Sequence, residues 1–159
     1  MSTIPRLAKT VGEQLLKRGE WLATAESCTG GLISAAITDI AGSSAWFGSG
    51  FVTYSNEAKC RMLEVDPKTL EAFGAVSAEV VGEMAEGARQ LAGADWSVAV
   101  SGIAGPTGGS VSKPVGTIWF AIAGPKGVET FCHHFNGDRQ SVRRQTVEAA
   151  LSCLLARIS

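Results

Sequence analysis

The segment TAESCTGG, residues 24–31, contains the side chains of this chain that are best suited to chemistry. Ser27 lies between a predicted strand and a predicted helix, so its hydroxyl can either cap the helix or act as a nucleophile. Two features favour the nucleophile. Thr29 can supply the cap, and Gly30 and Gly31 leave N–H groups of the first helical turn uncovered, where they can hold an anionic oxygen. The segment lacks the GxSxG pattern of the hydrolase nucleophile elbow.

A serine nucleophile needs a base, and here lysine is a better candidate than histidine. His133 and His134 are adjacent in a predicted strand and face opposite ways, so at most one of them can join a site. The segment YSNEAK places Tyr54 at a strand end and Lys59 one turn into the next helix. Lys59 can act as a base if burial lowers its pKa, and Tyr54 can relay the proton or orient the pair. A surface lysine and a half-buried tyrosine remain the simpler interpretation of this segment alone.

Two later segments offer contacts for an anion. SGIAGPTGG follows an apolar strand, and its successive N–H groups can form an anion nest with Thr107 at the tip, although a mobile connection has the same composition. The loop is longer than a turn requires, which favours a ligand loop, and it lacks the GK[ST] of a Walker motif. Arg139 and Arg143 share one face of the last helix and can hold a phosphate. On spacing alone, a solvated basic face is the simpler interpretation of these arginines.

The overall composition limits the class of protein. Hydrophobic residues make up 45% and charged residues 18%, which is typical of a folded globular chain. The net charge of -1 and the lack of a basic stripe predict no nucleic-acid partner. No apolar run reaches the roughly 18 residues of a membrane span. The four cysteines match no metal-binding spacing and follow no secretory segment, which predicts reduced thiols in a cytoplasmic protein.

Alternating helical and strand patterns predict how these segments are positioned. The predicted helices cover residues 5–19, 29–43, 56–63, 66–74, 77–93 and 138–159, and the predicted strands cover 21–27, 50–55, 95–105, 115–124 and 127–135. The alternation in the first half favours parallel crossovers, and the last two strands form a hairpin through PKG. We therefore expect a single-domain α/β protein, a three-layer α/β/α sandwich around a mixed, mostly parallel sheet. Glycine-rich turns at the strand ends are where such sheets bind ligands.

Five segments in this order, TAESCTGG, GFVTYSNEAK, SGIAGPTGG, KPVGT and GDRQSVRRQ, together resemble the CinA C-terminal domain family. The similarity extends over essentially the whole chain and implies one such domain over residues 1–159. Glu64 departs from the family, because relatives often have glycine there, and it is expected to affect a helix end rather than chemistry. The larger CinA proteins also carry an N-terminal domain that resembles molybdopterin-binding proteins, and we expect no property that depends on that domain here.

The resemblance also implies an activity and its residues. Family members that consist of this domain hydrolyse the carboxamide of nicotinamide mononucleotide to nicotinate mononucleotide and ammonia, in pyridine nucleotide recycling. The resemblance implies Ser27 as the nucleophile and Tyr54 and Lys59 as its partners, with no metal and no cofactor. The predicted substrate contacts are Thr29, Gly30, Gly31, Gly105, Thr107, Gly108, Arg139 and Arg143.

Two other classes of function remain open at this point. The same pocket could belong to a non-catalytic module that binds a pyridine nucleotide and signals to a partner. Nucleic-acid binding is a further alternative, against which the acidic balance argues. We also expect a homo-oligomer, because small α/β enzymes often pair symmetrically.

Overall fold

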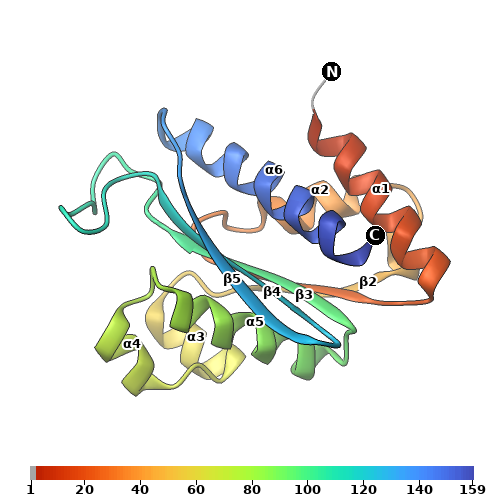
Figure 1. The fold of residues 1–159 in the computed structure, drawn as a ribbon, viewed down its shortest axis with the longest axis horizontal. Helices are drawn as coiled ribbons and strands as arrows, with labels where there is room; N and C mark the ends of the chain where they lie inside the picture. Colours follow the sequence, from red (N-terminus) through yellow and green to blue (C-terminus); the bar gives the residue numbers. More distant parts are fainter. Residues whose placement is uncertain (1–2) are drawn as a thin grey trace.

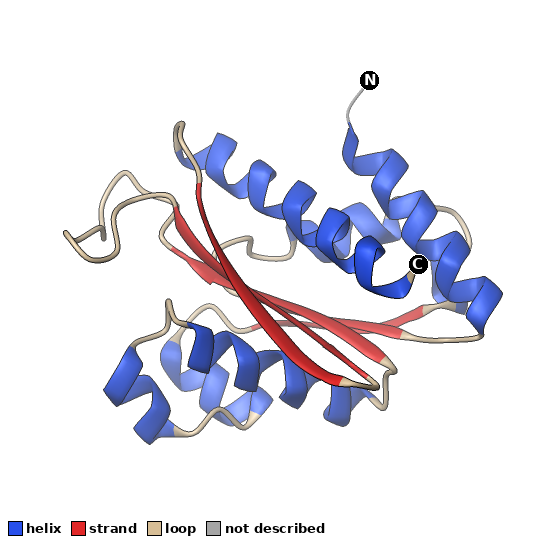
Figure 2. Cartoon of the chain, in the orientation of Figure 1, coloured by secondary structure: helices blue, strands red, loops and turns tan. Residues whose placement is uncertain are grey.

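The computed structural model describes residues 3–159, which form one α/β domain with a sheet between two layers of helices (Figures 1 and 2). The helices are α1 (Thr3–Arg18), α2 (Leu32–Thr38), α3 (Asn56–Leu63), α4 (Pro67–Phe73), α5 (Ala78–Ala92) and α6 (Arg139–Ile158). The strands are β1 (Leu22–Glu26), β2 (Phe47–Val52), β3 (Trp96–Gly102), β4 (Thr117–Gly124) and β5 (Gly127–His134), and a 3-10 helix, η1, covers Ser43–Ala45. The predicted sandwich is confirmed, although residues 1–2 of the predicted domain lie outside the described residues.

The sheet is mixed, as predicted, with the strand order β2-β1-β3-β4-β5. β1 pairs in parallel with β2 and β3, whereas β4 pairs antiparallel with β3 and β5. Four strands therefore run in one direction and β4 alone opposes them. The predicted hairpin between β4 and β5 turns through Pro125 and Lys126. The carboxyl ends of β1, β2 and β3 meet at one end of the sheet, which is where open α/β sheets bind ligands.

Alternation along β1 divides its side chains between the two faces of the sheet. Leu22 belongs to the apolar cluster under α1, α2 and α6, and Ala23 and Ala25 belong to the cluster under α5. Because successive side chains face opposite ways, Glu26 points toward α2, and Ser27, just past the strand, points toward the layer of α3 and α5.

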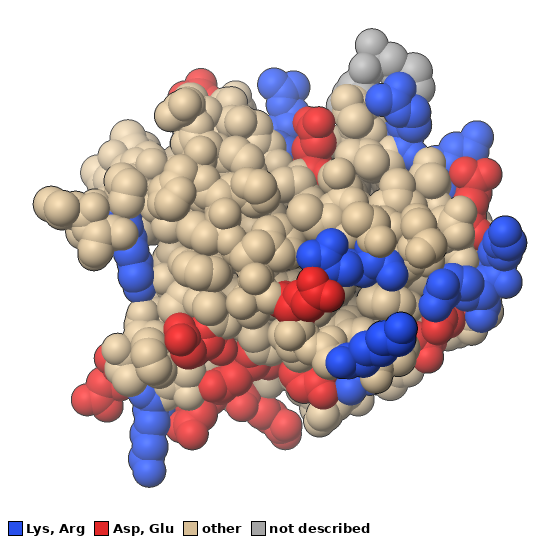
Figure 3. Space-filling model, in the orientation of Figure 1, with Lys and Arg blue, Asp and Glu red and all other residues tan. Residues whose placement is uncertain are grey.

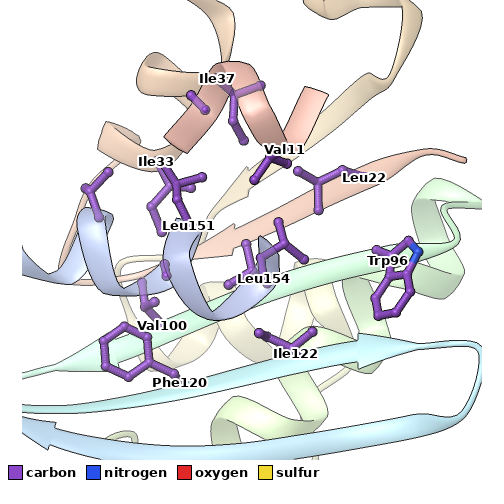
Figure 4. Packing of buried hydrophobic residues seen from close by; sticks show 14 of the residues in the cluster. Val11, Leu22, Ile33, Ile37, Trp96, Val100, Phe120, Ile122, Leu151 and Leu154 are labelled. Atoms are coloured by element: carbon purple, nitrogen blue, oxygen red, sulfur yellow. The ribbon is translucent and has the colours of Figure 1, made fainter. Parts of the chain in front are cut away.

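The two faces are packed differently. On the first face, large aliphatic and aromatic side chains fill the space between the helices and the sheet (Figure 4): Val11, Ile33, Ile37, Leu151 and Leu154 of the helices meet Leu22, Val100, Phe120 and Ile122 of the strands. On the second face the sheet presents small side chains to α5: Ala23, Ala25, Ala99, Ala121 and Ala123. Burial of this apolar surface is the main source of stability and makes the sheet a firm support for the turns at its end.

Two glycine turns correct the predicted helix over residues 29–43. The helix α2 begins only after Gly30 and Gly31, because their φ angles of 58° and 109° are incompatible with a right-handed helix. The helix also ends at Thr38 rather than at residue 43, and Gly42 precedes η1 with a φ of 83°. The segment between β1 and α2 is therefore a tight turn rather than the first turn of a helix.

Other helix ends agree with the sequence. Asp138 caps α6 by accepting a hydrogen bond from Ser141 N at 2.8 Å. Glu64 follows α3 with a φ of 61°, and it is the one non-glycine residue with positive φ in the described chain. That conformation favours glycine, so the departure at Glu64 does lie at a helix end.

Candidate active site

The structure brings Ser27 and Lys59 into direct contact. Lys59 Nζ lies 2.9 Å from Ser27 Oγ. Ser27 follows β1 directly and Lys59 lies on α3, the helix after β2, so the parallel pairing of β1 with β2 brings the two together. Both side chains are shielded from solvent, with Ser27 7% and Lys59 1% exposed.

Lys59 is buried among neutral oxygen atoms. Besides Ser27, its hydrogen-bond partners in residues 3–159 are the backbone carbonyls of Thr53 at 2.9 Å and Tyr54 at 3.4 Å. Burial without a carboxylate lowers the pKa of Lys59 from its ordinary value of 10.5 to about 8. About a tenth of the amine is therefore neutral at pH 7 and half at pH 8, which meets the requirement for a general base.

Cys28, the residue after Ser27, is a packing residue rather than a rival nucleophile. Its side chain belongs to the apolar cluster under α1, α2 and α6. Burial raises the pKa of its thiol to about 12. Because the thiolate is the reactive form of cysteine, Ser27 remains the nucleophile candidate of this segment.

Glu26 organises the turn after β1, and sequence reasoning missed it. Its carboxylate is fully buried. It accepts five hydrogen bonds, from Thr29 Oγ1 (2.5 Å), Gly31 N (3.2 Å), Ile33 N (2.9 Å), Ser34 N (2.9 Å) and Ser34 Oγ (2.8 Å). The carboxylate, rather than the predicted Thr29 hydroxyl, therefore caps α2. The available signal was a lone acidic side chain at the end of an otherwise uncharged strand.

The N–H groups of Gly30 and Gly31 are already in use. Gly30 N donates to Ser27 O at 3.1 Å, and Gly31 N donates to Glu26 Oε1 at 3.2 Å. The expectation that these two groups hold an anionic oxygen is not met, because both already have acceptors within the turn. Thr29 is fully buried, with its hydroxyl bonded to Glu26, so its side chain is also not presented to a substrate.

The Tyr54 hydroxyl does not reach the Ser27–Lys59 pair. The Tyr54 side chain is 63% exposed. Within residues 3–159 its hydroxyl has one hydrogen-bond partner, Arg139 Nη2 at 3.2 Å. Tyr54 lies past the end of β2, where its ring turns toward the start of α6 and only its backbone carbonyl contacts Lys59. The predicted proton relay through the hydroxyl is therefore not formed in this structure.

A pocket of about 250 Å³ opens over the pair. Its lining comes from the ends of β1 and β3, from α3, from the segment before α5 and from α6: Ser27, Cys28, Tyr54, Asn56, Lys59, Ala75, Val76, Ser101, Gly102, Ala104 and Arg139. Asn56 and Ser101 are polar residues that the sequence did not single out. Ser101 continues an alternation in β3 whose small side chains face α5, and this was the signal that could have found it.

The glycine loop between β3 and β4 projects beyond the sheet at the left of Figure 1. Gly105 O accepts a hydrogen bond from Arg139 Nη1 at 2.8 Å, which ties the base of the loop to the rim of the pocket. Thr107 and Gly108 lie farther along and line a separate surface hollow formed by the loop itself. The structure therefore brings Gly105 near the pocket but does not bring these two residues to it.

Arg143 is engaged with backbone rather than exposed to the pocket. Its Nε donates to Cys28 O at 3.0 Å and its Nη2 donates to Thr29 O at 3.1 Å. The predicted role as a phosphate contact is therefore not supported by the position of this guanidinium.

Other parts of the described chain offer less chemistry. A cavity of about 360 Å³ lies near the β4–β5 hairpin, but its arginines, Arg18 and Arg157, already pair with Glu20 and Glu129. No group of three or more His, Cys, Asp or Glu side chains in residues 3–159 is placed to hold a metal ion. None of the described helices combines the length and the apolar character needed to cross a membrane.

The surface charges form no basic stripe on the face shown in Figure 3. Acidic side chains gather over the layer of α3, α4 and α5, and the basic side chains near α1 and the end of α6 are interspersed with acidic ones. The face shown in Figure 3 therefore lacks the continuous basic track with which proteins follow a nucleic-acid backbone.

Comparison with known proteins shows the family. The CinA C-terminal domain family matches residues 5–158. Nicotinamide-nucleotide amidohydrolase PncC of Enterobacter agglomerans is 57% identical over 150 residues, covering 94% of this chain and 92% of that protein. The protein of the same name from Escherichia coli K12 is 56% identical over 154 residues, covering 96% and 93%. The crystal structure of a competence or damage-inducible protein from Enterobacter asburiae has a TM-score of 0.96 at 42% identity, with 100% of both chains covered.

The fold and the site together define an α/β domain with a buried serine–lysine pair at the carboxyl end of its parallel strands. The chain belongs to the CinA C-terminal domain family.

Proposed function

We propose that this protein is an amidohydrolase that converts nicotinamide mononucleotide to nicotinate mononucleotide and ammonia. Relatives that are named nicotinamide-nucleotide amidohydrolase and share more than half of the sequence support the substrate. The observation that carries the proposal is the 2.9 Å contact between Lys59 Nζ and Ser27 Oγ at the floor of a pocket. A role in pyridine nucleotide recycling, a cytoplasmic location and a homo-oligomeric state remain predictions.

The surroundings of Lys59 suit a neutral amine. A neutral amine has two N–H groups and one lone pair, and Lys59 has three neighbours. The carbonyls of Thr53 and Tyr54 can accept the two N–H groups. The lone pair then faces the Ser27 hydroxyl and can take its proton.

The proposed reaction proceeds in two halves and uses no metal or cofactor. Lys59 takes the Ser27 proton while Ser27 Oγ bonds to the carboxamide carbon. The protonated amine then gives its proton to the departing nitrogen, the carbon–nitrogen bond breaks and ammonia leaves an ester on Ser27. Lys59 next takes a proton from water, which attacks the ester, and that proton returns to Ser27 as the carboxylic acid leaves and loses its own proton to solvent.

The rim of the pocket is suited to the nucleotide part of the substrate. Arg139 is exposed beside the pocket and carries a positive charge for the phosphate. Tyr54 extends the wall at the same place, which gives it a role in binding rather than in proton transfer. Phosphate binding at the rim would orient the carboxamide over Ser27, as binding energy from a remote group can. Gly105 supports Arg139, whereas contacts from Thr107 and Gly108 remain predictions.

Ammonia release from nicotinamide mononucleotide tests the proposal. We expect Ser27→Ala and Lys59→Arg each to lower kcat by a factor of about 10³ or more, because the first removes the nucleophile and the second replaces the base with a group that stays protonated. Lys68→Arg on α4, an exposed lysine, is the matched control and should keep full activity. Full activity in either site variant would rule the mechanism out. Thermal stabilisation by the nucleotide without turnover in the wild type would indicate the non-catalytic binding module instead.

A further inference from the structure

Two backbone N–H groups beside Ser27 have no acceptor in another residue of the described chain, although the Cys28 N–H contacts the sulfur of its own side chain. Every other N–H from residue 27 to residue 34 is hydrogen-bonded, to Val100 O, Ser27 O, Thr29 O or the Glu26 carboxylate. The two that remain belong to Cys28 and Thr29. The N–H of the residue after the nucleophile is one of the two oxyanion donors in α/β-hydrolases, and Cys28 occupies that position here.

The directions of these two N–H groups follow from the carbonyls of the same peptides. In a planar trans peptide the C=O and the N–H point in opposite directions. Ser27 O accepts from Gly30 N, so the Cys28 N–H points away from the interior of the turn. Cys28 O accepts from Arg143 Nε, so the Thr29 N–H points away from α6.

Arg143 holds this arrangement from a distant part of the chain. Its guanidinium binds the carbonyls of Cys28 and Thr29 together, at 3.0 Å and 3.1 Å. The second bond fixes the Thr29–Gly30 peptide, whose N–H in turn holds Ser27 O. Gly30 leaves room for this contact, because a Cβ there would lie 3.3 Å from Arg143 Nη2. One side chain of α6 therefore orients, directly or through one further bond, both of the peptides whose N–H groups have no acceptor in another residue.

We propose that Arg143 is a positioning residue that holds the Cys28 and Thr29 N–H groups as the oxyanion donors of the Ser27 reaction. This inference rests on the proposed serine chemistry and gives Arg143 a role other than phosphate binding. Arg143 itself does not touch the substrate. It acts through the peptides that it orients, in place of the Gly30 and Gly31 donors expected from the sequence.

The loss of Arg143 should slow the chemical step without weakening substrate binding. One oxyanion donor contributes a factor of about 10² to 10³ in rate, and a donor that is present but loosely held loses part of that factor. In Arg143→Met we expect kcat for ammonia release to fall by about 10- to 100-fold, with KM for nicotinamide mononucleotide changed less than about threefold.

A fluorophosphonate provides a test that does not depend on the amide substrate. Ser27 Oγ bonds to phosphorus, the phosphorus–fluorine bond breaks, fluoride leaves and Lys59 takes the serine proton, while negative charge develops on the phosphoryl oxygen. We expect Arg143→Met to lower the labelling rate at Ser27 by about 10-fold or more. The midpoint of the pH dependence should stay unchanged, because Lys59 keeps its neighbours. Arg144→Met, which alters the exposed arginine next along α6, should label and melt like the wild type.

The outcomes separate this inference from the proposed function. Wild-type labelling and turnover in Arg143→Met would overturn it, and so would a raised KM with an unchanged kcat, which would make Arg143 a substrate contact. If Arg143→Met fails to fold, Arg143→Lys decides, because an ammonium reaches one carbonyl rather than two and should still label more slowly than the wild type. Labelling at Ser27 that depends on Arg143, in a protein that releases no ammonia from the nucleotide, would support the inference while the proposed substrate failed.

Discussion

Two regions at the end of β1 each bury a charged side chain, and they differ in what surrounds the charge. On the α2 side, Glu26 accepts five hydrogen bonds from the turn and the helix that follow it. On the α3 side, the hydrogen-bond partners of Lys59 among residues 3–159 are a serine hydroxyl and two backbone carbonyls. Two adjacent residues, Glu26 at the end of β1 and Ser27 just past it, thus lead to regions with opposite chemistry.

The difference separates a structural charge from a reactive one. A buried carboxylate that has all its donors ties elements together and has little tendency to react. A buried amine without a counter-ion is destabilised in its charged form, so burial lowers the pKa of Lys59 to about 8 and makes it a base near neutral pH. The burial that destabilises the charged form of Lys59 is therefore also what prepares its amine to act as a base.

Among the tests of this comparison, we expect the largest effect in how the unfolding free energy changes with pH because of Lys59. Its pKa is about 8 in the folded chain and near 10.5 in the unfolded chain, so between these values the unfolded state holds more protons and stability rises with pH. Relative to Lys59→Met, the wild type should therefore gain roughly 3 kcal/mol of unfolding free energy between pH 7 and pH 10.5. Urea unfolding at several pH values measures this difference.

Lys68→Met removes an exposed lysine and is the control for that measurement. Its difference from the wild type should stay the same at every pH. A constant difference for Lys59→Met as well would mean that Lys59 is not destabilised by burial.

For Glu26, the comparison predicts that a substitution lowers the unfolding free energy rather than removing a reacting group. In Glu26→Gln, an NH₂ group replaces one carboxylate oxygen and faces the donors of Ser34 or those of Gly31 and Ile33. We expect a loss of about 2 kcal/mol in unfolding free energy, measured by urea unfolding at pH 7. Glu13→Gln, on the exposed face of α1, should change it by less than about 0.5 kcal/mol. If Glu26→Gln also lost less than about 0.5 kcal/mol of unfolding free energy, the carboxylate would not hold the turn.

The smallest effect is expected at the rim of the pocket. Tyr54→Phe removes the hydroxyl that accepts from Arg139 and leaves the Tyr54 backbone carbonyl on Lys59. Because that hydrogen bond is exposed, KM for nicotinamide mononucleotide should rise by only about threefold, while kcat should change by less than about twofold. If kcat instead fell by about two orders of magnitude, Tyr54 would be restored to the proton relay that its place in the sequence suggests.

Much of this architecture follows from local patterns. Helical periodicity, alternation and glycine turns were sufficient to predict the order of the helices and strands, because most of them bury an apolar face of their own, although α4 and β5 contain no fully buried residue. The family resemblance implied Ser27 and Lys59 as partners, but the sequence did not show that they meet. They meet because each follows one of two neighbouring parallel strands, which end together. That contact depends on the strand order, which local pattern does not contain.

The remaining features depend on contacts that no local pattern contains. Glu26 caps α2 through donors up to eight residues away, and this requires the turn conformation of Gly30 and Gly31. Arg143 binds the turn after β1, which lies 114 residues away in the sequence. Its spacing from Arg139 placed both arginines on one helix face, but that spacing could not show that the Arg143 guanidinium binds backbone carbonyls. The direction of the Tyr54 hydroxyl was likewise decided by Arg139, which lies 85 residues away.

The most direct test of the account is the pH profile of kcat/KM for ammonia release from nicotinamide mononucleotide. If neutral Lys59 is the base for Ser27, kcat/KM should rise from pH 7, pass its midpoint near the Lys59 pKa of about 8 and level off above pH 9. A profile that stays flat or falls across that range would contradict the central claim that burial prepares this lysine to activate the serine.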